Sequence, residues 1–272
     1  MIEFIQLSAG ILLQMLFCAL MTVSSILVAK HFLTRATIVE QICAAGVICF
    51  WLASLVFNVL VNLRLFYSAP ALISAAAIFI AACRQTSCQT DLKAFWHRLF
   101  KLFTRTLQVC NKSLAGKAAA FSFAAFTCLL LTRSLLLPMI CWDSLTYHTV
   151  KANLWVQNGC HYSLESPGLW ESYKTFPGGG EAFTALSMVF TRNDFFGSMP
   201  DFLLWLLMGA MAFAIAKELT FKSGTALAVS AAIIATPVLT RMVGSGYVDT
   251  GVATFLLGGI LFFMKLTNTK RT

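Results

Sequence analysis

A cluster of titratable side chains follows a long apolar segment near the middle of the chain. It lies in Cys141-Trp142-Asp143-Ser144-Leu145-Thr146-Tyr147-His148, and Lys151 follows directly. If this stretch is helical, Asp143 and Tyr147 share one face, and His148 and Lys151 form the adjoining stripe. A carboxylate beside a phenol, an imidazole and an ammonium group can activate a hydroxyl and bind an anion. The alternative is an interfacial helix in which Asp143 is only the N-cap.

A second acidic turn lies further along the chain. It runs from Arg241 to Asp249, includes Tyr247, and places Gly244 and Gly246 on either side of a serine. The two glycines allow a tight bend and allow another group to approach the backbone closely. A guanidinium and a carboxylate on one such turn can bind and orient a polar substrate. The alternative is that the aspartate only forms the turn.

The chain that must position these groups has the composition of a membrane protein. Of its 272 residues, 58% are hydrophobic and 11% are charged, and the mean hydropathy is +0.79. Soluble domains carry about 25% charged residues, so a soluble fold is excluded. In a membrane protein the net charge of +9 bears on orientation and does not indicate a nucleic-acid partner. The nine cysteines include no CxxC pair, so neither a zinc site nor a disulfide framework is indicated.

Seven apolar segments approach the roughly 20 residues that a membrane-spanning helix needs. They predict an all-α, polytopic membrane protein with additional juxtamembrane helices in an external loop at 139–200. The segments are 4–29, 38–63, 66–83, 118–138, 201–219, 224–240 and 250–266. We expect a three-helix anchor at 1–83, a basic cytoplasmic loop at 84–117 and a third unit at 118–272. Arg133, near the end of the fourth segment, is expected to be an interfacial anchor.

The basic loop contains an amphipathic pattern at 92–107. Aromatic and leucine side chains fall on one arc of the 3.6-residue period, and Lys93, Arg98, Lys101 and Arg105 fall on the other. This pattern describes a helix that lies in the membrane interface and recognises anionic lipid. The alternative is a loop that only fixes the topology.

The charge distribution predicts the orientation of the chain. The positive-inside rule places the basic loop in the cytoplasm, and alternation then puts the N-terminus outside and the C-terminus inside. Asp143 and Asp249 share the external face only if residues 182–196 do not cross the membrane. The apolar run 182–190 has nine residues and is followed by Thr191-Arg192-Asn193-Asp194. It is too short to span, so we predict an interfacial or half-inserted helix there.

The order of three motifs resembles that of the GT-C membrane glycosyltransferases. The likeness is to the branch of dolichyl-phosphate-mannose–protein mannosyltransferases and bacterial aminoarabinose transferases, and it covers about residues 118–266. In that family a helix delivers a catalytic acidic residue to the first external loop, the place of Asp143, and a second external turn carries another, matched by Asp249. The motifs are Trp142-Asp143-Ser144-Leu145-Thr146-Tyr147-His148, then Phe176-Pro177-Gly178-Gly179-Gly180-Glu181, then Gly246-Tyr247-Val248-Asp249.

The resemblance implies a function for these residues. It implies transfer of a sugar, with inversion, from a polyprenyl-phosphate carrier to a glycan, lipid or protein on the external face of a membrane such as the bacterial inner membrane. Asp143 would be the catalytic base. Substrate would be bound by Tyr147, His148, Lys151, Glu181, Arg241, Tyr247 and Asp249.

The sequence also departs from the family. Ser245–Thr250 is similar to a turn of the single-subunit oligosaccharyltransferases, in which a second aspartate helps to bind a metal. Gly251 stands at that position here, so no cofactor is firmly indicated and a divalent cation stays an open alternative. Three extra helices precede the module, and the chain stops after the module's fourth helix. The resemblance therefore implies a truncated frame, half of a split enzyme that needs a second membrane subunit, or a non-catalytic relative.

The alternative function follows from these departures. It is a non-catalytic membrane subunit, or a transporter-like component, of a system that assembles cell-envelope glycans. The sequence has no internal repeat and no ionisable pair in the middle of an apolar segment, and both features argue against a transporter.

Overall fold

The computed structural model describes residues 2–86, 88–111, 113–162 and 178–269, and the regular elements in this part of the chain are all helices. Six of them are long and apolar enough to cross a membrane. These are α1 (Ile2–Phe32), α2 (Ile38–Asn62), α3 (Ser68–Gln85), α5 (Leu114–Leu136), α9 (Met199–Glu218) and α12 (Asp249–Thr269). They agree with the predicted all-α class and indicate an integral membrane protein.

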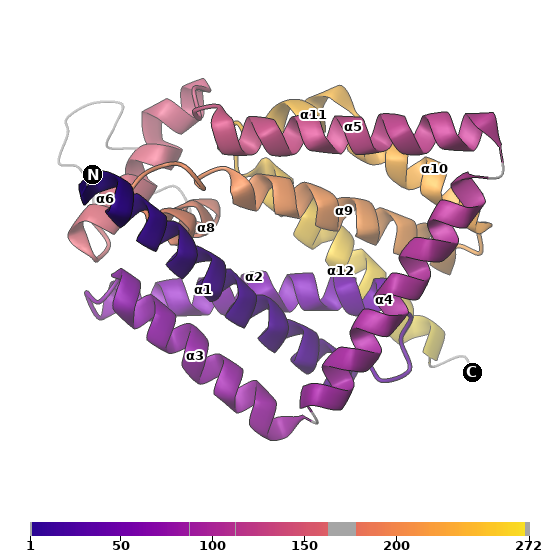
Figure 1. The fold of residues 1–272 in the computed structure, drawn as a ribbon, viewed down its shortest axis with the longest axis horizontal. Coiled ribbons are helices and arrows are strands. Elements are labelled where there is room, and N and C mark those ends of the chain that lie inside the picture. Colours follow the sequence, from indigo (N-terminus) through magenta and orange to yellow (C-terminus); the bar gives the residue numbers. More distant parts are fainter. Residues whose placement is uncertain (1, 87, 112, 163–177, 270–272) are drawn as a thin grey trace.

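The other elements are shorter or more polar. They are α4 (Cys88–Cys110), the π-helical turn η1 (Ser144–His148), α6 (Thr149–Asn158), α8 (Gly179–Met188), α10 (Ser223–Ile234) and α11 (Pro237–Met242). Figure 1 shows that α2, α5 and α9 run nearly parallel to one another, whereas α4 crosses one end of the bundle at a steep angle.

The sixth predicted span, 224–240, is divided in two. The helix α10 ends at Ile234, and a new short helix starts at Pro237. Proline has no backbone N–H and disfavours helical geometry in the residue before it, and Thr236 accordingly adopts φ −56° and ψ 129°. With 12 residues, α10 is shorter than the roughly 20 that cross a hydrocarbon core. The described chain therefore has six long apolar helices where the sequence predicted seven.

Two groups of helices make up the core. In the first, α1, α2 and α3 pack together with α6 and α8, and Phe57, Phe66, Trp155 and Ala185 are buried between them. In the second, α9 packs against α10 and α12 around Trp205, whose indole N–H donates to the carbonyl of Ile234. Helix α2 contacts α9 and joins the two groups. Side chains from the predicted units 1–83 and 118–272 therefore share one core, and the boundaries between these units stay predictions.

Helix α8 lies in the segment that would have to cross the bundle if the turn after α5 and the turn before α12 were at opposite ends. It has 10 residues, and nearly all of them from Glu181 to Met188 are buried inside the protein. Its side chains pack against α1, α2 and α6, so its apolar face is covered by protein, and the interfacial or half-inserted position predicted for it stays a prediction. The chain does not cross at this point, and the turn after α5 meets the turn before α12 through a hydrogen bond from Ser144 Oγ to the carbonyl of Ser245.

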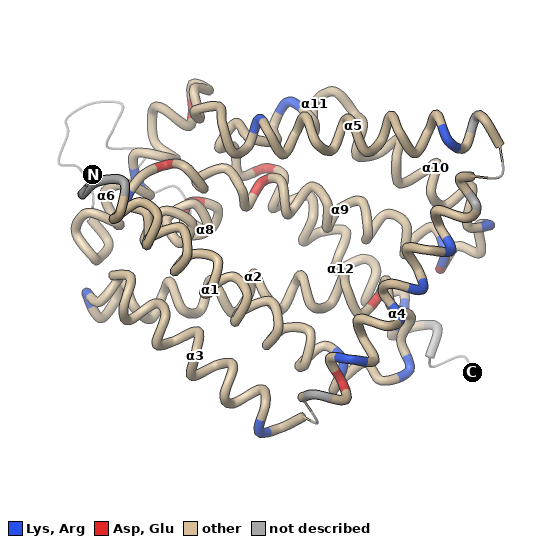
Figure 2. The backbone as a smooth tube through the Cα atoms, in the orientation of Figure 1, with Lys and Arg blue, Asp and Glu red and all other residues tan. Residues whose placement is uncertain are grey.

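Charged side chains are divided between the two ends of the bundle. Figure 2 shows lysine and arginine along α4 and at the neighbouring helix ends, and carboxylates near η1, α8 and the start of α9. Lys265 bridges Glu40 and Glu218 at 2.8 Å and 2.6 Å, which ties α12 to α2 and α9. By the positive-inside rule, the end that carries α4 is expected to be cytoplasmic.

Cysteine labelling in intact cells tests this orientation. In a cysteine-free background, Trp142→Cys and Val238→Cys should react with an impermeant maleimide from outside, because both side chains are exposed. Ser113→Cys precedes α5 and Lys222→Cys precedes α10, at the helix ends near α4 (Figure 1), and both should react only after the membrane is permeabilised. Reaction of Trp142→Cys and Val238→Cys on opposite sides would contradict the arrangement of the two turns.

Candidate functional site

The segment after α5 places Asp143 at the end of a membrane-spanning helix. The chain leaves the helix at Leu137 in an extended conformation, and Asp143 is already helical at φ −65° and ψ −32°. The carboxylate is half-buried and makes no capping hydrogen bond to the turn that follows. The interpretation of Asp143 as a simple N-cap therefore loses its structural basis.

The turn that follows Asp143 is a π-helix. The N–H of Thr149 donates to the carbonyl of Ser144, five residues earlier, and this wider turn changes the register of the side chains. As a result His148 is buried and points towards α8, where its Nδ1 lies 3.0 Å from Oε1 of Glu181. Single π-helical turns in proteins occur frequently at functional sites.

Glu181 is the most deeply buried carboxylate of the site. Its side chain is fully enclosed, and Oε2 has no hydrogen-bond partner among the described residues. The nearby Lys151 is also partly buried; burial lowers the pKa of its ammonium group, and the Glu181 charge opposes that shift. The ammonium nitrogen lies 5.7 Å from the centre of the Tyr147 ring, a cation–π arrangement.

The turn before α12 packs tightly against both segments. Gly244 and Gly246 have φ of 76° and 79°, which side chains rarely tolerate. A Cβ atom on Gly246 would lie 2.7 Å from Ser144 Oγ, and one on Gly180 would lie 2.1 Å from Val248 Cγ1. The sequence thus uses glycine wherever the three segments approach one another.

Tyr247 lies within the electrostatic influence of charged residues from several of these segments. Burial raises the pKa of its phenol, Asp143 adds the largest charge effect, Asp249 adds a smaller one, and Arg241 opposes them. The phenol therefore stays protonated and can donate a hydrogen bond. Its ring also contacts that of His148, with centroids 6.4 Å apart. Tyr247 thereby connects the pair of His148 and Glu181 to the exposed Asp249 and Arg241.

The structure brings the predicted site residues together at one end of the bundle. They form two adjoining groups: Asp143, Arg241, Tyr247 and Asp249, and Tyr147, His148, Lys151 and Glu181. The acidic and aromatic residues Glu165, Glu171, Phe176 and Pro177 lie outside the described part of the chain.

Arg133 has a different neighbourhood from the one expected of an interfacial anchor. Its guanidinium donates to the carbonyls of Thr240 and Arg241, at 3.4 Å and 3.0 Å. Nearby, Ser198 Oγ donates to the carbonyl of Ser134 at 2.7 Å. These bonds fasten the end of α5 to α11 and to the start of α9, directly beside the candidate site.

Asp201 is a site residue to which sequence reasoning gave no role. It is buried in the first turn of α9, and its Oδ2 accepts a hydrogen bond from the backbone N–H of Gly246 at 3.1 Å. An acidic residue after a proline is a common helix-start signal, and Met199-Pro200-Asp201 fits that pattern. The pattern explains why the local sequence shows only a helix start and not the contact with a distant turn.

The turn Ser245–Thr250, which is similar to a metal-binding turn of the oligosaccharyltransferases, has no set of metal ligands around it among the described residues. Among the described residues there is no group of three or more histidine, cysteine, aspartate or glutamate side chains that could hold a metal ion. Gly251, where a ligand would be needed, faces Leu204 and Phe255.

A comparison of the chain with known protein families, with characterised proteins and with solved structures finds no match. The function proposed below therefore rests on the chemistry of the site and on the resemblance of its motifs.

Proposed function

We propose that this chain is a membrane glycosyltransferase that transfers a sugar, with inversion, from a polyprenyl-phosphate carrier to an acceptor hydroxyl. One observation carries the proposal: Ser144, the neighbour of Asp143, donates to the carbonyl of Ser245 in the turn before α12, at one end of a bundle of helices long enough to span a membrane. The charges of Asp143, Arg241 and Asp249 all act on Tyr247 in that turn. The same three motifs, in the same order, give the chain its resemblance to the GT-C enzymes.

Asp143 is the proposed general base. Its carboxylate takes the proton from the acceptor hydroxyl as the oxygen attacks the anomeric carbon. The bond between that carbon and the phosphate oxygen breaks on the opposite side, and the phosphate leaves with the bonding electrons, which inverts the configuration. The partial exposure of Asp143 suits this role, because the carboxylate stays accessible to an acceptor while the hydrogen bond from the adjacent Ser144 to the carbonyl of Ser245 holds its backbone.

Lys151 and Arg241 are the proposed partners of the leaving phosphate. Cations pair strongly with phosphate oxygens, and the developing charge on the leaving group needs such a partner. Lys151 is partly desolvated, which strengthens its interaction with an anion. Arg241 is exposed at the end of α11, where a headgroup at the membrane surface can reach it.

The other residues position these groups and bind the sugar. His148 and Glu181 hold η1 against α8 through their hydrogen bond, and the Tyr147 ring packs at a tilt against the His148 ring with centroids 4.0 Å apart. Asp201 fixes the glycine turn that carries Tyr247. Asp249 and the protonated Tyr247 are the proposed contacts to sugar hydroxyls.

The proposed orientation puts the site at the external leaflet. The basic end of the bundle is then cytoplasmic, with the N-terminus outside and the C-terminus inside, as the distribution of lysine and arginine favours. A bacterial inner membrane is the proposed location, because polyprenyl-phosphate sugars and a range of glycan, lipid and protein acceptors meet there.

A transfer assay tests the proposed function. Membranes that contain the protein are supplied with radiolabelled polyprenyl-phosphate sugars, and the label is followed from the lipid carrier into glycan, lipid and protein fractions. The expected result is transfer that depends on this chain. If no donor is consumed above the level of membranes without the protein, the proposal that this chain transfers sugar fails.

Asp249→Asn is expected to weaken substrate binding more than the chemical step. Asp249 is exposed and touches no proton that moves in the proposed reaction. Loss of a charged hydrogen bond to a sugar hydroxyl should raise KM roughly tenfold to a hundredfold, with kcat nearly unchanged. Steady-state kinetics against the donor provide the measurement. A fall in kcat at unchanged KM would instead place Asp249 in the chemical step.

A further inference from the structure

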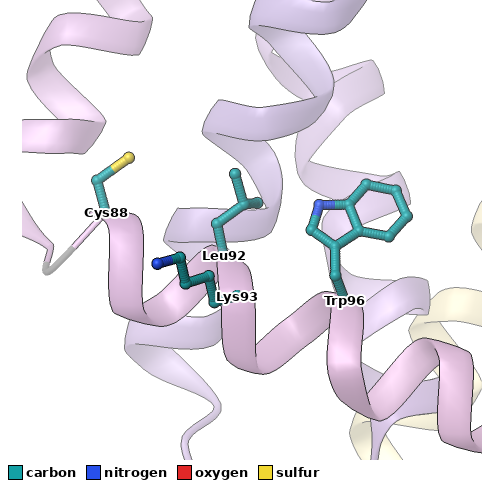
Figure 3. A pocket seen from close by; sticks show the side chains of 4 residues that line it. All are labelled: Cys88, Leu92, Lys93 and Trp96. Atoms are coloured by element: carbon teal, nitrogen blue, oxygen red, sulfur yellow. The ribbon is translucent and has the colours of Figure 1, made fainter.

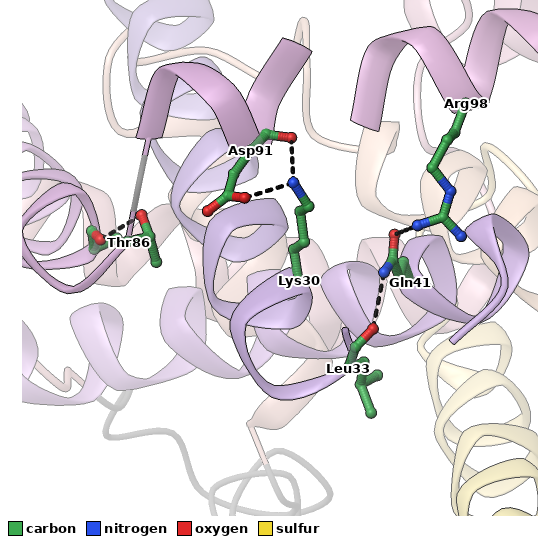
Figure 4. Close-up of polar contacts among 7 residues, drawn as sticks. Lys30, Leu33, Gln41, Thr86, Asp91 and Arg98 are labelled. Atoms are coloured by element: carbon green, nitrogen blue, oxygen red, sulfur yellow. Dashed lines mark hydrogen bonds and ion pairs between the residues drawn. The ribbon is translucent and has the colours of Figure 1, made fainter. Parts of the chain in front are cut away.

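Helix α4 carries a surface that the proposed function does not use. The helix is fastened to the bundle along one edge: Lys30 Nζ lies 2.5 Å from Oδ1 of Asp91, and Arg98 donates to Oε1 of Gln41 at 3.3 Å (Figure 4). Arg98 also donates to the carbonyl of Ala36 at 2.8 Å. Phe95, on the same edge, is buried against α1 and α2. These contacts fix which side of α4 faces away from the protein.

The side of α4 that faces away is amphipathic. Trp96, Phe100, Phe103 and Leu107 form an exposed apolar stripe at helical spacing, with exposed fractions of 53%, 68%, 58% and 42%. An exposed polar stripe lies beside it and contains Lys93, His97, Lys101 and Arg105. An apolar stripe next to a cationic stripe, on a helix that crosses one end of a membrane-spanning bundle, has the form of a helix that lies in a membrane interface (Figure 1).

A pocket at the start of α4 adds a specific feature. It has a volume of about 530 Å³ and is lined by Cys88, Leu92, Lys93 and Trp96. Figure 3 shows Leu92 and Trp96 extending from one side of the helix, with the Lys93 ammonium group beside Leu92. A cation beside an aliphatic side chain, with an aromatic side chain one turn further along the helix, suits a phosphate group that is attached to an acyl chain.

We propose that α4 is a docking surface for anionic phospholipid in the leaflet opposite the Asp143 site. The aromatic stripe enters the boundary between headgroups and acyl chains, to a depth of roughly 5–10 Å. Lys93, Lys101 and Arg105 pair with lipid phosphates, and the pocket holds one headgroup beside Lys93. The cations of the polar stripe are complementary in charge to an anionic leaflet, which is why we assign this surface to anionic lipid. This inference is independent of the proposed glycosyltransferase activity.

Lipid selectivity of the full chain tests the proposal. The protein is reconstituted in phosphatidylcholine, and its preference for spin-labelled phosphatidylglycerol is measured by electron paramagnetic resonance. The variant Lys93→Gln/Lys101→Gln/Arg105→Gln should lower this preference on the order of 100-fold. Each cation near an anionic surface contributes about fivefold, and the three contributions multiply. The matched control is Arg35→Gln/Lys117→Gln/Lys222→Gln, which removes the same charge from exposed positions outside α4. It should keep most of the preference. Equal losses in both variants, or no loss in the first, would overturn the proposal.

A second measurement does not depend on folding of the triple variant. Nitroxide labels at Phe100 and at Lys101, one at a time in a cysteine-free background, report whether each stripe faces lipid or water. In membranes with phosphatidylglycerol, the Phe100 label should be more accessible to oxygen and the Lys101 label to a water-soluble nickel complex. If both labels are accessible to nickel, α4 faces water, a protein partner becomes the better occupant, and the lipid proposal is rejected.

Discussion

We expect Asp143→Asn to lower the rate of sugar transfer by about 100-fold to 10,000-fold, because general-base assistance typically contributes that much. Asparagine keeps the size of the side chain and removes the charge that accepts the proton. The side chain makes no capping hydrogen bond, so its loss should not disturb η1 or the membrane insertion of α5. The measurement is kcat in the transfer assay, together with the amount of correctly inserted protein.

The matched control for Asp143→Asn is Asp194→Asn, which changes an exposed aspartate at the same end of the bundle. It should transfer sugar at the wild-type rate. Asp143→Glu should also be slow, since the carboxylate moves by one methylene from a backbone that the adjacent Ser144 holds against the carbonyl of Ser245. Wild-type turnover in Asp143→Asn would show that the proton goes elsewhere, and the role proposed for Asp143 would then be wrong.

The second large effect is expected on stability, from the buried pair of His148 and Glu181. In His148→Leu the Glu181 carboxylate stays enclosed in the protein and loses the partner at 3.0 Å from Oε1. Removing one member of a buried charged pair typically costs roughly 3–5 kcal/mol. Chemical unfolding in mixed micelles should show a loss of this size. The exposed His161 offers the control, and His161→Leu should change stability far less.

The double variant His148→Leu/Glu181→Met makes the interpretation specific. Apolar residues of similar volume often replace a buried pair with little loss, so the double variant should regain most of the lost stability. Its transfer activity should stay low if the pair positions η1 for catalysis. A double variant less stable than either single variant would mean that the two side chains contribute independently, which contradicts the pairing.

The long helices and the pairing of the two acidic turns could be predicted from the sequence. Apolar length alone predicts α1, α2, α3, α5, α9 and α12. The short run at 182–190 indicated that the chain does not cross there, so Asp143 and Asp249 had to lie at one end. Both inferences depend on how many residues a membrane-spanning helix requires, which is a local property.

Other features depend on contacts that local sequence does not encode. The break before Pro237 is visible as a proline, but prolines near helix ends and at kinks are common in membrane helices, so it did not decide between one helix and two. The π-helical turn moves His148 from the predicted stripe beside Asp143 and Tyr147 to a buried contact with Glu181, which lies 33 residues away. Periodicity assumes 3.6 residues per turn and cannot anticipate such a shift.

The fastening of α5 has a mechanical consequence. The bonds from Arg133, Ser198 and Ser144 all join this helix and its exit to the rest of the protein at the end that carries Asp143. Along its length α5 turns Phe121 and Leu129 outward, and its other end follows α4. The side-chain hydrogen bonds that hold α5 and its exit are thus concentrated at the end nearer the proposed base. A bilayer of different thickness is expected to tilt such a helix least at the fastened end, so the position of Asp143 should depend little on the thickness of the host membrane.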